Sequence, residues 1–162
     1  MEPQDFNRWI DSATPVITDF DDWCRMNPGW SGSWTDDFPK LPAITVKELL
    51  DSWKSDELNQ SPLCANYDSS RGEFVLFQAL YDENLINIAV GIARLRGAQQ
   101  FCKPGVRSYV LVAPLFWDPG ITALLEIHAE GSTFIEEGAV PPDVMDEADA
   151  LLNEYLQTMP DD

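Results

Sequence analysis

The residues with the clearest chemical potential in this sequence are Glu126 and His128, two positions apart in a run of alternating apolar and polar residues. Side chains at i and i+2 of a β-strand point to the same face of a sheet, so a carboxylate and an imidazole would lie side by side. Such a pair could transfer protons or begin a metal site. His128 is the single histidine, and no further ligands stand at a metal-binding spacing. We therefore predict no metal site and no cofactor.

Other residues that could do chemistry form no specific catalytic pattern. The glycine motifs of nucleotide-binding loops and the Gly-x-Ser-x-Gly motif of serine hydrolases are absent from the sequence. The acid pairs at 36–37 and 136–137 are adjacent in the chain, which is weak evidence for the facing carboxylates of a glycosidase. The three cysteines are widely spaced and outside any Cys-x-x-Cys motif, so they predict neither a disulfide framework nor a zinc site. We predict no catalytic residues and favour a binding function.

The stretch that contains the Glu-x-His pair, residues 108–138, predicts the central sheet. Runs rich in Val, Ile, Tyr, Phe and Trp are cut by a Pro-Gly pair and then by a Gly, the pattern of successive antiparallel strands joined by tight turns. Alternation over residues 121–129 predicts a strand with one face in the core and the other partly wet. The preceding run, residues 109–117, is apolar on both faces, so we expect cover on both sides of it.

Periodic apolar residues and end signals predict five helices. Thr45 and Glu48 form a capping box at the start of one of them. Residues 85–97 also fit a strand, but acids before the segment, basic residues near its end and a Gly after it favour a helix. Residues 73–81 are interpreted as a strand and residues 60–71 as a connection. The predicted helices cover residues 2–12, 15–26, 46–58, 85–97 and 141–159.

Together these elements predict an α+β fold, with a central antiparallel sheet of about three to five strands packed with N-terminal helices and a C-terminal helix. The length fits a single globular domain over residues 1–162, and 44% hydrophobic residues suffice for a core. No apolar run is long enough to span a bilayer, and the N-terminal residues lack the basic and apolar regions of a secretory signal. We expect a cytoplasmic protein without membrane contact.

The net charge of −18, from 28 acids and 10 bases, is the most unusual property of the sequence. Residues 1–70 carry 13 acids and 5 bases, residues 71–107 carry 3 acids and 5 bases, and residues 108–162 carry 12 acids and no base. Solubility alone needs a net charge of magnitude about 2 to 8. The acidic field disfavours direct binding of nucleic acid or anionic membranes and attracts basic proteins. A surface that is merely well solvated is the alternative.

Two segments carry the predicted partner-binding residues. Residues 27–42 have the composition of a loop, yet Trp30 and Trp34 stand beside Asp36 and Asp37, which combines interface anchors with charge. Alternatively, these aromatic side chains fold back onto the core. The predicted C-terminal helix carries five acids and no base, so no ion pair along it offsets their repulsion. The predicted partner-binding residues are Trp30, Trp34, Asp36, Asp37, Asp143, Asp146, Glu147, Asp149 and Glu154.

Our leading hypothesis is a cytosolic, non-enzymatic binding protein that neutralises a basic protein partner. Its simplest biological form is an immunity protein or antitoxin that occludes the active site of a toxin such as a nuclease. Two alternatives belong to other classes. An acidic chaperone for a secreted effector protein would be a dimer with an apolar groove open to its client. A small enzyme would use Glu126 and His128 within a pocket.

Overall fold

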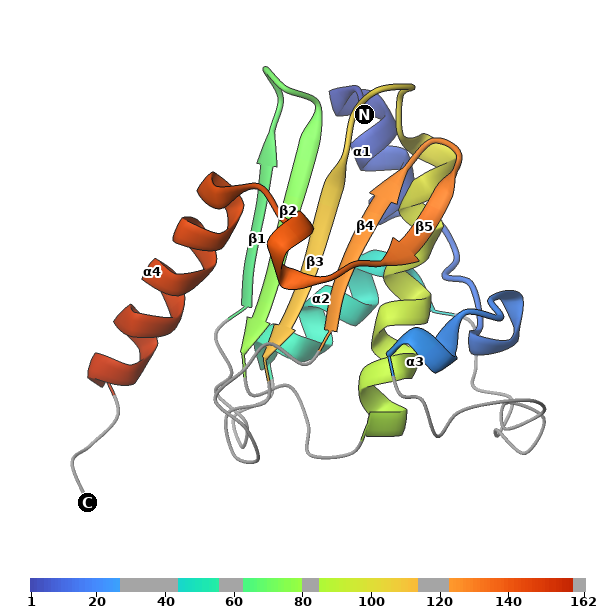
Figure 1. The fold of residues 1–162 in the computed structure, drawn as a ribbon. Helices are drawn as coiled ribbons and strands as arrows, with labels where there is room; N and C mark the ends of the chain where they lie inside the picture. The colour runs from blue at the N-terminus through green and yellow to red at the C-terminus, as the bar shows by residue number, and fades with distance from the viewer. Residues whose placement is uncertain (27–43, 56–62, 80–84, 114–122, 159–162) are drawn as a thin grey trace.

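A computed structural model describes residues 1–26, 44–55, 63–79, 85–113 and 123–158 of the chain (Figure 1). Within these ranges the chain forms one five-stranded sheet with the strand order β1-β2-β3-β4-β5. The strands are β1 (Leu63–Asp68), β2 (Glu73–Ala79), β3 (Ser108–Ala113), β4 (Ala123–His128) and β5 (Gly131–Phe134). The α-helices of the described residues are α1 (Pro3–Ile10), α2 (Val46–Ser55), α3 (Leu85–Arg96) and α4 (Pro142–Thr158).

The sheet differs from the expected one in the direction of one strand pairing and in the additional strand β1. β2 and β3 run parallel, with Val75 opposite Tyr109, whereas the other three pairings are antiparallel. Parallel neighbours need a crossover connection, and α3 provides it between β2 and β3. The α+β class is therefore confirmed, while the sheet is mixed rather than wholly antiparallel.

Most of the predicted helices are confirmed, and the capping box is formed as expected. The Thr45 N–H donates to Glu48 Oε2 at 2.7 Å, and the Glu48 N–H donates to Thr45 Oγ1 at 3.1 Å. α2 is described as far as Ser55, and the remainder of the helix predicted over residues 46–58 lies outside the described residues. α3 and β2 confirm the helix and the strand chosen for the two ambiguous segments.

The helix predicted over residues 15–26 is wrong. The chain instead forms two short 3-10 turns, η1 (Ile17–Asp19) and η2 (Trp23–Arg25). Side-chain hydrogen bonds hold these turns: the Val16 N–H donates to the Asp19 carboxylate at 2.9 Å, and Trp23 Nε1–H donates to the Ile17 carbonyl at 3.0 Å. Ile17 and Trp23 are both buried. Their packing against the core outweighs the helical spacing of the sequence.

The connection predicted over residues 60–71 is also wrong in part, because it contains β1. β1 pairs with β2 antiparallel along its whole length, from Leu63 opposite Gln78 to Asp68 opposite Glu73. An edge strand has one strand neighbour and tolerates polar residues that a central strand excludes. The polar composition was therefore a poor guide to the backbone there.

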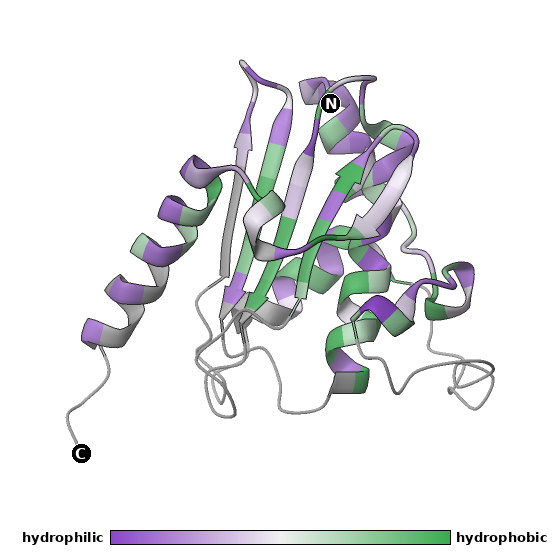
Figure 2. Cartoon of the chain, in the orientation of Figure 1, coloured by the Kyte–Doolittle hydropathy of each residue, from purple (hydrophilic) through white to green (hydrophobic). Residues whose placement is uncertain are grey.

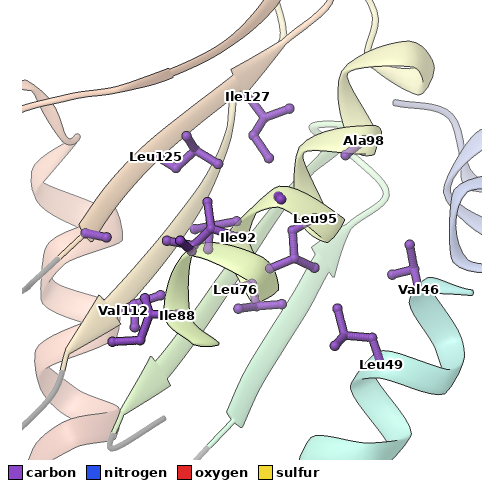
Figure 3. Close-up of a cluster of buried hydrophobic side chains, with 14 of the residues drawn as sticks. Val46, Leu49, Leu76, Ile88, Ile92, Leu95, Ala98, Val112, Leu125 and Ile127 are labelled. Carbon is purple, nitrogen blue, oxygen red and sulfur yellow. The ribbon is translucent and has the colours of Figure 1, made fainter. Parts of the chain in front are cut away.

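One face of the sheet carries the larger core cluster, to which α1, α2 and α3 contribute (Figures 2 and 3). Ile88, Ile92 and Leu95 of α3 lie against the sheet, where Leu76 and Val112 point toward them. All five side chains are buried. Burying side chains of this kind contributes roughly 1.5 to 3 kcal/mol each, so this layer is a main source of stability.

The opposite face is covered by α4 and by Val140, two residues before it. Val140, Val144 and Ala148 are buried in a second cluster with Phe77 of β2 and Leu111 of β3. The described part of the run that begins at residue 109 is thus covered on both sides, as its composition predicts. α4 is held to the sheet by these apolar contacts, which fixes which of its residues face outward.

A buried guanidinium connects three segments that are far apart in the sequence. The side chain of Arg96, at the end of α3, is 3% exposed and forms two hydrogen bonds to the Asp22 carboxylate, at 2.6 and 3.1 Å. It also donates to the hydroxyl and the carbonyl of Ser132 in β5, each at 2.7 Å. Its guanidinium carbon lies 4.0 Å from the centre of the Phe20 ring. We call Arg96, Asp22, Ser132 and Phe20 the Arg96 cluster.

Removing the carboxylate of this cluster is expected to destabilise the fold strongly. Asp22→Ala leaves the Arg96 charge buried without its counter-charge, which should lower the free energy of unfolding by about 3 kcal/mol. Asp21→Ala, at an exposed neighbouring position, is the matched control and should change it by less than about 0.5 kcal/mol. Urea denaturation measures both. Equal losses in the two variants would contradict the assigned role of Asp22.

Gly72 in the turn between β1 and β2 is in close contact with the first residue of the chain. Its φ is +68°, and a Cβ there would lie 2.6 Å from the Met1 carbonyl oxygen. Met1 is buried, its ammonium donates to the Gly72 carbonyl, and its own carbonyl accepts a hydrogen bond from the Tyr67 hydroxyl at 2.9 Å. Position 72 therefore requires glycine both for its left-handed backbone conformation and for the close approach of Met1.

Comparing substitutions of Gly72 and Gly105 separates the cost of the left-handed backbone from the cost of the collision with Met1. Gly105 has a similar φ of +80° but open space around its missing Cβ, so Gly105→Ala should cost only the left-handed backbone strain, about 1 to 2 kcal/mol. Gly72→Ala adds the collision with Met1 and should cost at least about 1 kcal/mol more. Thermal or urea unfolding of both variants measures the difference. Equal stability of the two variants would show that Met1 moves aside freely.

Candidate partner-binding surface

The inward residues of α4 determine where its acids point. Val144 and Ala148, four positions apart, are buried against the sheet. Positions on the other side of the helix therefore face away from the sheet, and Asp143, Asp146 and Asp149 are all exposed there. We call these three residues the acidic stripe. Its members project from one rigid helix, whose hydrophilic outer side is visible in Figure 2.

Among the described residues, a cation contacts the acidic stripe at its first residue, Asp143. Asp143 is 3.3 Å from the guanidinium of Arg71, which also contacts the Glu73 carboxylate at 2.9 Å. In the described part of the chain, no ion pair joins Asp146 or Asp149 to a cation. These two carboxylates thus create a negative field that the chain itself leaves largely uncompensated, and such a field attracts a positively charged surface.

Most cations of the segment 71–107 are occupied by carboxylates elsewhere in the fold. Arg107 contacts Glu126 at 3.0 Å, Lys103 pairs with Glu2, and Arg96 binds within its own cluster. The exposed pairs of Arg107 and Lys103 contribute little stability. The consequence of the three pairs is electrostatic, because these bases neutralise acids outside α4, whereas Arg71 contacts α4 at Asp143.

The other predicted partner-binding residues have different positions. Glu147 of α4 is half-buried, and the backbone of Glu154 lies in the same helix while its side chain is outside the described part. Four further predicted residues lie in the segment 27–43, which is outside the described residues: Trp30, Trp34, Asp36 and Asp37. The structure therefore brings together the helical part of the predicted site and leaves the loop part a prediction.

Glu126 and His128 each bind a partner of their own. The Glu126 carboxylate is nearly buried and accepts a hydrogen bond from Arg107 at 3.0 Å. His128 Nδ1 lies 2.9 Å from Glu130 Oε2, on the exposed turn after β4. Within the described ranges, no three side chains of the His, Cys, Asp and Glu types gather closely enough to hold a metal ion. Glu126 and His128 are thus not hydrogen-bonded to each other.

The parallel pairing of β2 and β3 brings the polar side chains of Tyr109 and Glu73 near each other, which was not predicted from the sequence. Tyr109 is 4% exposed, and burial, together with the nearby Glu126 carboxylate, raises the pKa of its phenol. Glu73 lies on the neighbouring strand β2, near the same end of the strands, and its charge raises the pKa of Tyr109 further. In the sequence, the two-residue spacing of Arg107 and Tyr109 indicates that their side chains point to the same face of a strand. The sequence does not indicate that β2 lies beside that strand.

Comparisons with protein-family models, with curated proteins and with solved structures gave no match to this chain. None of the helices in the described residues combines the length and the apolar character needed to cross a membrane. The large apolar side chains exposed among the described residues are Val16 and Ile86.

The Glu73 carboxyl group near the acidic stripe should give stability a measurable pH dependence. Burial raises the pKa of Glu73, Asp143 and Asp68 raise it further, and Arg71 opposes them. A raised folded-state pKa means that the wild type loses stability as the pH rises from about 4 through that pKa. The variant Glu73→Gln cannot ionise, so its stability relative to the wild type should increase between about pH 4 and pH 7. Urea unfolding across this range measures it.

Glu48 provides a control of opposite sign. The hydrogen bonds from the Thr45 backbone N–H and hydroxyl lower the pKa of Glu48. A lowered folded-state pKa stabilises the protein above the ordinary pKa, and this stabilisation disappears as the pH falls. Glu48→Gln should therefore lose stability relative to the wild type over the same rise in pH. Parallel curves for the two variants would show that the surroundings of Glu73 do not disfavour its charge.

Proposed function

We propose that this protein binds a basic protein in the cytoplasm and occludes its functional site, as an immunity protein or antitoxin does for a toxin. The observation that carries the proposal is the acidic stripe of α4, whose residues Asp146 and Asp149 are exposed and join no ion pair in the described part of the chain. A charge of −18 exceeds what solubility requires. The exposed carboxylates aligned on one helix support a role in recognition.

The rigidity of α4 suits this role. Because Val144 and Ala148 anchor the helix on the sheet, its carboxylates are held in place before the partner arrives. Complementary charge then steers the encounter and can raise association rates to about 10⁸ to 10⁹ per molar per second at low salt. Fast capture is the property that an inhibitor of a harmful enzyme requires.

A nuclease is a fitting partner on electrostatic grounds. Its substrate groove is lined with cations that bind phosphates spaced about 3.4 Å apart along each strand axis. Residues three apart on an α-helix are about 4.5 Å apart along its axis, so Asp143, Asp146 and Asp149 present negative charge at a comparable density. The acidic stripe could therefore occupy cationic subsites that the nucleic acid would otherwise fill.

Neutralising α4 tests the proposal without changing its length or apolar side. The partner is captured from the native host, and its association rate is measured by stopped flow at several salt concentrations. The triple variant Asp146→Asn, Asp149→Asn, Glu154→Gln should associate at least about tenfold more slowly at low salt and show a flatter salt dependence. Circular dichroism checks that the fold is unchanged.

The matched control removes the same number of charges from exposed positions elsewhere. The triple variant Asp11→Asn, Asp21→Asn, Asp51→Asn lies outside α4 and should keep most of the wild-type rate. Equal slowing in both triple variants would attribute association to total charge rather than to α4. An unchanged rate in the α4 variant would refute the proposed role of the acidic stripe.

A further inference from the structure

The two edges of the sheet are protected unequally. β5 forms one edge, is four residues long and is occupied by side chains from outside the sheet. Arg25 donates to the Thr133 hydroxyl at 2.9 Å and to the Phe134 carbonyl at 3.4 Å, and Arg96 donates to the Ser132 carbonyl at 2.7 Å. The outward carbonyls of β5 are thus already hydrogen-bonded, which blocks the addition of another strand.

β1 forms the other edge and has none of these features in the described residues. It is six residues long and pairs with β2 alone. Its sequence, Leu-Cys-Ala-Asn-Tyr-Asp, contains no Lys or Pro, and its one charged residue, Asp68, stands at the end of the strand. No backbone hydrogen bond from another described element reaches its outer side. The outward N–H and C=O groups of β1 therefore form a template for a further strand.

The acidic stripe lies near the edge of the sheet that β1 forms. The turn that joins β1 to β2 contains Arg71, and the ion pair between Arg71 and Asp143 ties the turn to the first turn of α4. Figure 1 shows α4 on the β1 side of the sheet. A strand added to β1 would consequently run beside a helix that carries exposed negative charge. Charge complementarity selects a cationic segment as the occupant.

We propose that an extended, lysine- or arginine-rich segment of the basic partner pairs with the outer edge of β1 and sets its cationic side chains near the acidic stripe. Backbone hydrogen bonds along β1 supply affinity that depends little on sequence, and Asp146 and Asp149 supply the preference for positive charge. The inference rests on the proposed function, since it specifies how the basic partner is held.

A pair of synthetic peptides tests the edge without altering the protein, which avoids variants that fail to fold. The first peptide alternates Lys and Val, and the second has the same sequence with consecutive residues N-methylated, so that it keeps the charge but offers no N–H groups on either edge for a strand ladder. The first peptide should slow hydrogen exchange at β1 amides. The second should give no such protection and bind at least about tenfold more weakly.

The other outcomes separate this inference from the proposed function. Equal binding of both peptides without protection of β1 overturns pairing at the edge while leaving charge-driven binding of a basic partner in place. Absence of binding by either peptide overturns the edge proposal. Equal protection of β1 by a peptide alternating Glu and Val overturns the cationic occupant. A dimer in sedimentation, with β1 protected before any peptide is added, overturns it in favour of a second copy of the chain.

Discussion

The burial of one positive charge, on Arg96, constrains more of this fold than any other single interaction. A guanidinium that is 3% exposed needs a counter-charge and acceptors for its N–H groups, and Asp22 and Ser132 provide them. Meeting this need fixes the path of the N-terminal segment through η1 and η2 and holds β5 against the end of α3. The same side chain closes one edge of the sheet, so the buried charge also affects how the protein can meet others.

A second constraint comes from strands that are apolar on both faces. Phe77 and Leu111 would face water if the sheet were covered only by α1, α2 and α3. α4 is the cover for this second face, and its position follows from the need to bury Val144 and Ala148. Asp143, Asp146 and Asp149 of α4 then point outward. The packing of α4 thus directs its carboxylates away from the sheet, and the negative electrostatic field that they create is the physical basis of the proposed binding role.

Local signals in the sequence were reliable, and long-range ones were not. The capping box at Thr45 and Glu48 and the two-sided apolarity of the run from residue 109 were readable because neighbours in the chain determine them. The face of β4 that was expected to be partly wet is instead buried at Leu124 and Glu126, because the chain covers both sides of the sheet. The exposure of the α4 acids followed from its apolar period. The strand β1 and the turns η1 and η2 were missed, because both depend on partners such as β2 and Arg96 that lie far away in the sequence. The parallel pairing of β2 and β3 was missed for the same reason.

The excess of negative charge and the open edge of β1 can be understood together. An unprotected edge strand normally promotes association between identical chains. Two copies of this protein each carry a charge of −18, and bringing their edges together would place one acidic stripe near another. Repulsion therefore protects the edge against self-association without a lysine or proline in the strand itself. The same charge favours a cationic chain at that edge. The negative charge thus disfavours a second copy of this chain and favours the proposed basic partner.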